Sequence, residues 1–148
     1  MKKEVTLYLR ANEGKKIRDT VLRYMGCLLM EYKGNQKYIF FEEIKETSHS
    51  RVMLHLLENA LQMLKEPCTV KVVALAPFFS LGFGYIETKE ENRDLGLKIT
   101  EIMREHRHTI LFHYHNKLNE TEEGLEIFKM FEKEFADQRK GIRMSTEY

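Results

Sequence analysis

The segment from Lys33 to Phe79 constrains the fold of this chain more than any other, because its elements follow one another in a clear order. Lys33–Gln36 has the composition of a turn, and the strand-forming run Lys37–Lys45 follows it. A helix is predicted over Ser48–Lys65, since hydroxyl residues precede leucines spaced three and four residues apart. A proline ends that helix, and the apolar strand Thr69–Ala76 comes next. This order of elements predicts an α/β fold.

The flanking sequence completes the predicted sheet. The remaining predicted elements are the strands Val5–Ala11, Val21–Tyr32 and Thr109–His115, a loop over Asn12–Thr20, a short helix over Pro77–Gly84, and the helices Leu95–Arg104 and Thr121–Gln138. The first three strands pair through short connections, and the last two arrive through helical crossovers. We therefore expect a five-stranded mixed sheet in the order 3-2-1-4-5 with helices on both faces. One domain is expected over residues 1–138, followed by a flexible C-terminal tail over 139–148.

Composition limits the classes of function. The chain has 148 residues, 43% of them hydrophobic, and a net charge of +1. A net charge this small gives no strong overall attraction to nucleic acid or to anionic lipid. Cys27 and Cys68 show no zinc-ligand spacing and are expected to be buried free thiols of a reducing compartment. The charged start MKKEVTLYLR does not read as a signal peptide, so we expect a cytoplasmic protein without a membrane partner.

Over roughly Lys3 to Ala136 the chain resembles the ribonuclease H family. The run Tyr24–Gly34 is similar to that family's second strand and hairpin, and Thr47–Lys65 is similar to its first helix. Ile110–His115 is similar to its fifth strand. The resemblance implies a ribonuclease H-like fold for the whole region. It also implies where a two-metal active site would lie.

The positions that the family fills with metal-binding carboxylates hold other residues here. Arg10, Met53 and Leu75 stand at three of these positions, and Glu126 (with Leu125 as the other candidate) is closest to the fourth. Two-metal hydrolysis needs carboxylates that hold two divalent ions about 4 Å apart. A register error does not restore them, because residues 5–12 and 70–80 contain no Asp or Glu. The resemblance therefore implies a catalytically inactive domain with no metal and no cofactor.

Arg10 is expected to pair with an acid of the last helix, Glu126 or Glu122. If that acid were buried, Arg10→Ala would destabilise the fold by about 2–4 kcal/mol. The alternative is that Arg10 contacts phosphate in place of the lost metal charge.

Other side chains leave alternatives open. Lys15, Lys16 and Arg18 are possible nucleic-acid contacts, although such clusters are usually solvated surface. The aromatic residues around Pro77–Tyr85 suit base stacking or a protein contact. His106, His108, His113 and His115, with the acidic last helix, are the basis for a divergent nuclease or phosphotransfer enzyme.

The leading interpretation is an inactive ribonuclease H-like domain that binds nucleic acid, as RNA or an RNA–DNA hybrid, or a protein partner. The other interpretations are the divergent enzyme and a structural assembly domain. The sequence alone does not choose between nucleic acid and protein, and it gives no oligomeric state.

Overall fold

The computed structural model describes residues 2–115 and 121–146, with side chains as far as residue 139. Within the described residues, six strands form one mixed sheet. They are β1 (Lys3–Ala11), β2 (Lys15–Arg18), β3 (Val21–Tyr32), β4 (Asn35–Glu46), β5 (Cys68–Ala74) and β8 (Thr109–Tyr114). The helices are α1 (His49–Met63), α2 (Arg93–His106) and α3 (Glu122–Thr146), with a 3-10 turn η1 (Glu90–Asn92) before α2.

The predicted strand order is confirmed. β1 pairs antiparallel with β3, β3 pairs antiparallel with β4, and β5 lies parallel between β1 and β8. The order β4-β3-β1-β5-β8 is the predicted 3-2-1-4-5 order. β2 pairs with the first residues of β3, along the same edge of β3 that pairs with β1 further on. The carboxyl ends of β1 and β5 therefore lie next to each other.

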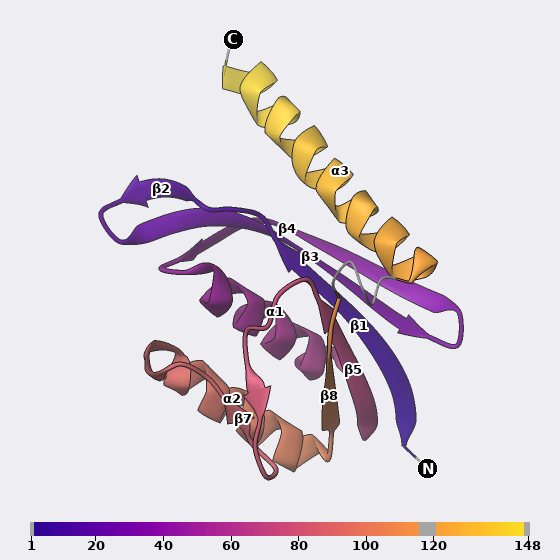
Figure 1. Cartoon of the computed structure of the whole chain (residues 1–148). Helices are drawn as coiled ribbons and strands as arrows, with labels where there is room; N and C mark the ends of the chain where they lie inside the picture. Colours follow the sequence, from indigo (N-terminus) through magenta and orange to yellow (C-terminus); the bar gives the residue numbers. More distant parts are fainter. Residues whose placement is uncertain (1, 116–120, 147–148) are drawn as a thin grey trace.

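The two faces of the sheet are covered by different helices. α1 and α2 lie on one face and α3 crosses the other (Figure 1). Side chains alternate along β1, so Leu7 and Leu9 pack on the α1 side while Tyr8 packs against α3. α3 contributes the buried side chains of Phe128, Phe131 and Phe135. The layers match the expected α/β architecture with helices on both faces.

Two predicted loops have different structures. The region Asn12–Thr20 was expected to be a loop but contains β2, whose four side chains are all exposed and therefore give no hydrophobic pattern. The segment Pro77–Gly84, expected as a short helix, leads into the hairpin of β6 (Ser80–Leu81) and β7 (Ile86–Glu87). Gly84 has a φ of +74°, a left-handed conformation that reverses the chain at the hairpin turn and favours glycine.

The last helix is longer than predicted. α3 continues past the expected end at Gln138 to Thr146. The part of the expected tail from 139 to 146 is thus helical, and residues 147–148 lie outside the described residues. None of the described helices is long and apolar enough to cross a membrane.

Candidate functional site

An open cavity of about 620 Å³ lies at the end of the sheet where β1 and β5 finish. Its walls come from the strands β1 to β4, the β1–β2 connection, α1, the segment after β5, and α3. The lining residues are Leu9, Arg10, Ala11, Asn12, Glu13, Gly14, Lys15, Arg23, Tyr24, Met25, Glu42, His49, Met53, Leu75, Ala76, Glu132 and Arg139. We call this cavity the cleft.

The cleft brings together three of the four positions that the family resemblance assigns to a degenerate active site. Arg10, Met53 and Leu75 all line it, although they are far apart in the sequence. Glu126 does not line it. Met53 is buried and Leu75 is half-buried, so the cleft floor is apolar there. The family resemblance predicts that Arg10, Met53 and Leu75 lie at one site, and the structure places all three in the cleft.

Of the three candidate nucleic-acid contacts, the cleft includes one. Lys15 lines it, whereas Lys16 and Arg18 do not. All three side chains are exposed on β2. Lys15 is therefore the member of this basic cluster that a ligand in the cleft would meet.

Backbone and side-chain contacts fix the wall formed by the β1–β2 connection. The Asn12 side-chain oxygen accepts a hydrogen bond from the backbone N–H of Met25 at 2.7 Å, and the backbone N–H of Asn12 donates to the Met25 carbonyl oxygen at 3.1 Å. A Cβ on Gly14 would lie 2.7 Å from the Tyr24 ring, so only glycine lets the chain pass this closely. His49 Nε2 lies 3.1 Å from the Ala11 carbonyl oxygen and joins the start of α1 to the end of β1.

Arg10 pairs with α3, but through a different residue from those predicted. Its position on β1, two residues after Tyr8, directs it to the α3 face. Its Nε donates to a carboxylate oxygen of Glu132, not to Glu126 or Glu122. Glu126 and Glu132 are both exposed, but Glu132 lies four residues after Phe128 and three before Phe135, at the edge of the buried stripe of α3, where its carboxylate reaches Arg10.

The Arg10–Glu132 pair is also less buried than expected. The Arg10 side chain is 27% exposed and the Glu132 side chain is 49% exposed. Water therefore screens the pair, and the premise of a buried acid left alone by Arg10→Ala is wrong.

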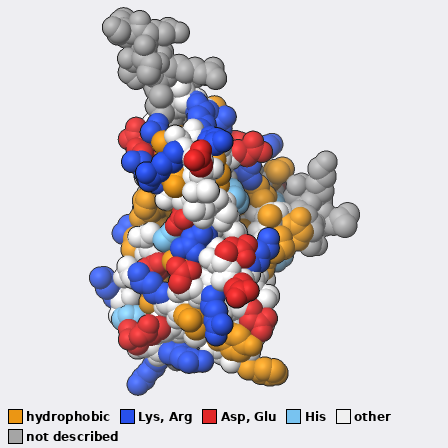
Figure 2. Space-filling model, turned by 90° about the vertical axis from the view of Figure 1, so that its left-hand side faces the viewer, with side chains coloured by type: hydrophobic (Ala, Val, Ile, Leu, Met, Phe, Trp, Pro, Cys, Tyr) orange, Lys and Arg blue, Asp and Glu red, His pale blue; other side chains and the backbone are white. Residues whose placement is uncertain are grey.

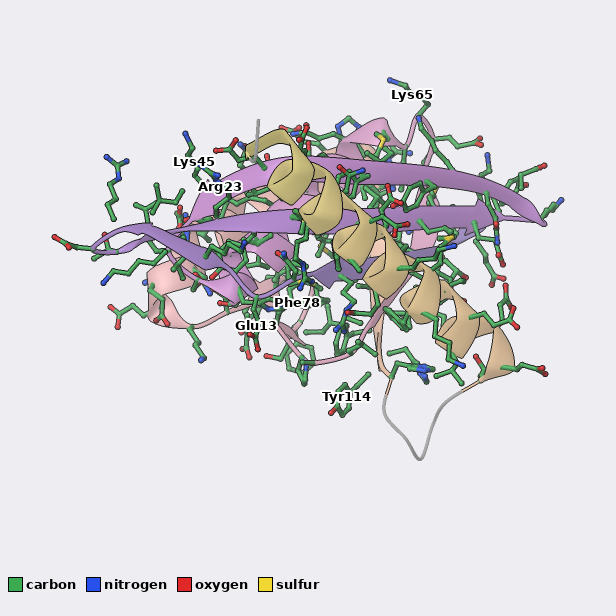
Figure 3. The ribbon with its side chains drawn as sticks, turned by 90° about the horizontal axis from the view of Figure 1, so that it is seen from above. Glu13, Arg23, Lys45, Lys65, Phe78 and Tyr114 are labelled. Carbon is green, nitrogen blue, oxygen red and sulfur yellow. The ribbon has the colours of Figure 1, made fainter. Side chains whose placement is uncertain are left out.

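The cleft contains charges of both signs. Lys15, Arg23 and Arg139 line it together with Arg10, and Glu13, Glu42 and Glu132 are the acids. Figure 2 shows the same mixture on the surface, with Lys and Arg side chains interleaved with Asp and Glu. The Nε of Arg139 is buried and has no hydrogen-bond partner among the described residues. Figure 3 shows Arg23 on β3, Glu13 on the β1–β2 connection, and Lys65 well away from both.

The histidine cluster lies outside the cleft. His108 is buried and its Nδ1 accepts a hydrogen bond from the Cys68 amide at 3.1 Å, and burial lowers the pKa of His108. His115 is buried against Phe128, with ring centroids 5.3 Å apart. Within residues 2–115 and 121–146, no three His, Cys, Asp or Glu side chains are grouped so that they could hold a metal ion. Among these described residues, the predicted histidines therefore do not form a metal site with the acids of α3.

The predicted aromatic surface is divided in the structure. Phe78 and Phe79 are buried and pack edge-to-face on Phe112. Phe83 is fully exposed and Tyr85 is 40% exposed, both near the β6–β7 turn. Cys27 and Cys68 are buried free thiols, as expected.

Sequence reasoning missed several polar residues of the cleft, among them Arg23, Glu42, His49, Glu132 and Arg139. His49 lies within the predicted helix Ser48–Lys65, where the sequence gives it no separate role, and Arg139 is the first residue of the predicted tail. Glu132 could have been found, because helical spacing from Phe128 places it at the edge of the face of α3 that packs against the sheet.

Comparison with known proteins supports the fold and leaves the activity open. No family model matches the chain. A ribonuclease H of Sulfurovum sp. (strain NBC37-1) is 37% identical over 73 residues, which are 49% of this chain. The match spans 46% of that relative, so the chain is aligned with about half of its length.

Solved structures match over more of the chain at lower identity. LC11-RNase H1 in complex with an RNA/DNA hybrid has a TM-score of 0.53 and 14% identity, covering 74% of this chain and 85% of that one. RNase H1 from the halophilic archaeon Halobacterium salinarum has a TM-score of 0.54 and 9% identity, covering 75% and 86%. The chain therefore has the α/β ribonuclease H-like fold, with a mixed sheet between α1 and α3.

Proposed function

We propose that this chain is a catalytically inactive ribonuclease H-like domain that binds nucleic acid through the cleft. The observation that carries the proposal is that Arg10, Met53 and Leu75 line one cavity. A guanidinium, a thioether and an alkyl group occur where the family resemblance implies carboxylates. Divalent ions such as Mg²⁺ require oxygen ligands, and a fixed positive charge repels them.

The acids that remain in the cleft do not replace the missing ones. Glu132 is bound to Arg10, so much of its charge is already compensated. Glu13 and Glu42 come from the β1–β2 connection and from β4, and the described residues form no metal-binding group with them. The cleft is therefore better suited to binding an anionic ligand than to two-metal hydrolysis.

An RNA–DNA hybrid is the nucleic acid that we propose first. The structurally similar LC11-RNase H1 was solved with such a hybrid. Lys15 and Arg23 at the cleft supply the cations that contact phosphate oxygens. The small net charge of the chain does not prevent this, because a local basic group binds phosphate whatever the overall balance.

Binding is tested with a fluorescent RNA–DNA hybrid and anisotropy at low salt, in the presence of a metal chelator. We expect the wild type to bind the hybrid, and Lys15→Glu to weaken binding. Lys65→Glu is the matched control, since Lys65 lies away from the cleft (Figure 3). Absence of binding by the wild type, or equal losses in the two variants, would contradict the proposal.

A further inference from the structure

We propose that Arg10 and Arg139 together form a metal-free phosphodiester-binding site in the cleft, with Glu132 as the residue that positions Arg10. This inference rests on the proposed nucleic-acid binding and names the group that the cleft recognises. The ligand chemistry is a backbone phosphate of a polynucleotide, held by guanidinium groups.

The geometry of Arg10 suits a phosphate. Within the described residues, its side chain hydrogen-bonds through Nε alone, to Glu132. The two terminal nitrogens of the guanidinium therefore remain for another acceptor. A guanidinium presents its N–H groups in a rigid fork that matches two oxygens of a phosphate. Because Glu132 holds one edge of that fork, the direction of the other N–H groups is restricted before a ligand arrives.

Arg139 provides the second observation. It lines the same cleft, and its buried Nε has no hydrogen-bond partner among the described residues. A buried donor without an acceptor is costly, and most such groups in folded proteins have a partner. Arg139 lies seven residues after Glu132, which is two helical turns and the same face of α3. An anion in the cleft would compensate the charge of this guanidinium.

The two arginines, rather than the overall charge of the cleft, favour an anion over a cation. Glu132 is engaged by Arg10, and Arg139 has no ion pair among the described residues, although Glu13 and Glu42 offset Lys15 and Arg139 in the total charge. A divalent ion placed here would face Arg10 and Arg139 at short range. A phosphate would instead be attracted by both.

The first experiment measures hybrid affinity as a function of salt in chelator for Arg10→Ala and Arg139→Ala. Each is expected to weaken binding roughly ten-fold or more and to reduce the salt slope by about 1, since one phosphate contact is lost. Arg10→Lys should keep the salt slope but bind more weakly than the wild type, because an ammonium lacks the fork. Arg104→Ala is the matched control, as Arg104 is exposed in the last turn of α2 and does not line the cleft.

The second experiment compares two variants that should change the affinity for the hybrid in opposite directions. Glu42→Gln removes a negative charge from the cleft and should strengthen hybrid binding through electrostatics alone. Glu132→Gln removes the same charge but also replaces the ion pair with a weaker neutral hydrogen bond, so Arg10 is held less firmly and we expect hybrid binding to weaken. Thermal melts of each variant confirm that the protein is folded at the assay temperature.

The outcomes separate this inference from the proposed function. If the wild type binds the hybrid and both arginine variants resemble Arg104→Ala, the phosphodiester site is wrong and the proposed function stands. If Glu132→Gln strengthens binding as Glu42→Gln does, the positioning role of Glu132 is wrong. If the wild type binds no hybrid at all, the proposed function fails and this inference fails with it.

Discussion

The Arg10–Glu132 ion pair should contribute little to the stability of the fold. With Glu132 half exposed, the pair resembles a surface salt bridge more than a buried one. Pairs of that kind contribute about 0.2–1 kcal/mol in double-mutant cycles. The aliphatic part of the Arg10 side chain buries some apolar surface, and its loss adds roughly a few tenths of a kcal/mol. We therefore expect Arg10→Ala to lower the free energy of unfolding by about 1 kcal/mol or less.

This prediction is measured by urea denaturation of four proteins, namely the wild type, Arg10→Ala, Glu132→Ala and the double variant. The coupling free energy between the two sites should be about 0.5 kcal/mol. With a denaturant slope of about 1.5 kcal/mol/M, the midpoint of Arg10→Ala would shift by roughly 0.3–0.6 M. A coupling above about 2 kcal/mol would refute the reasoning, because it would require a pair shielded from water.

Three further perturbations test the packing and the electrostatics. Phe131 is fully buried between α3 and the sheet, so Phe131→Ala should destabilise the fold by about 3–5 kcal/mol in urea denaturation, and a loss below about 1 kcal/mol would contradict this packing. Gly26 lets α1 pack close to β3, since a Cβ at this position would lie 2.9 Å from a methyl carbon of Leu56. Gly26→Val should therefore lower the melting temperature. An unchanged melting temperature would show that the strand and the helix can move apart without cost. The hydrogen bond from Arg51 lowers the pKa of Asp94 from 3.8 to about 2. The ionised Asp94 therefore stabilises the fold above pH 3.8, and this contribution disappears as the pH falls through 2. The stability difference between the wild type and Asp94→Asn should shrink over that range, and a difference that grows on acidification would overturn the assignment.

The sheet was predictable because its strands follow hydrophobic patterns that pairing rules can order. Val21–Tyr32 and Thr69–Ala76 are apolar enough to be recognised as strands, and short connections fix which strands are neighbours. β2 was missed because exposed residues such as Lys15 carry no such pattern, and its pairing with β3 depends on tertiary structure. The β6–β7 hairpin was missed because a short apolar segment with glycines does not distinguish a helix from a turn.

The cleft was predictable in part. The family resemblance placed Arg10, Met53 and Leu75 at one site, and the structure brings them into one cavity. The partner of Arg10 was not predicted correctly, because the choice among the acids of α3 depends on how that helix is rotated on the sheet. Phe128 and Phe135 determine that rotation, and they bring Glu132 to Arg10. His49 carried no signal in the sequence that would have distinguished it from a residue at the start of a helix.

The central claim is most directly tested by incubating the purified protein with an RNA–DNA hybrid whose RNA strand is end-labelled, in Mg²⁺ and separately in Mn²⁺. Because three of the positions that would hold metal ions supply no carboxylate, we predict that the RNA strand remains intact on a denaturing gel while the hybrid is bound. Metal-dependent cleavage that Glu132→Gln or Glu126→Gln abolishes would contradict the account, since it would show that the carboxylates of α3 support catalysis in this chain.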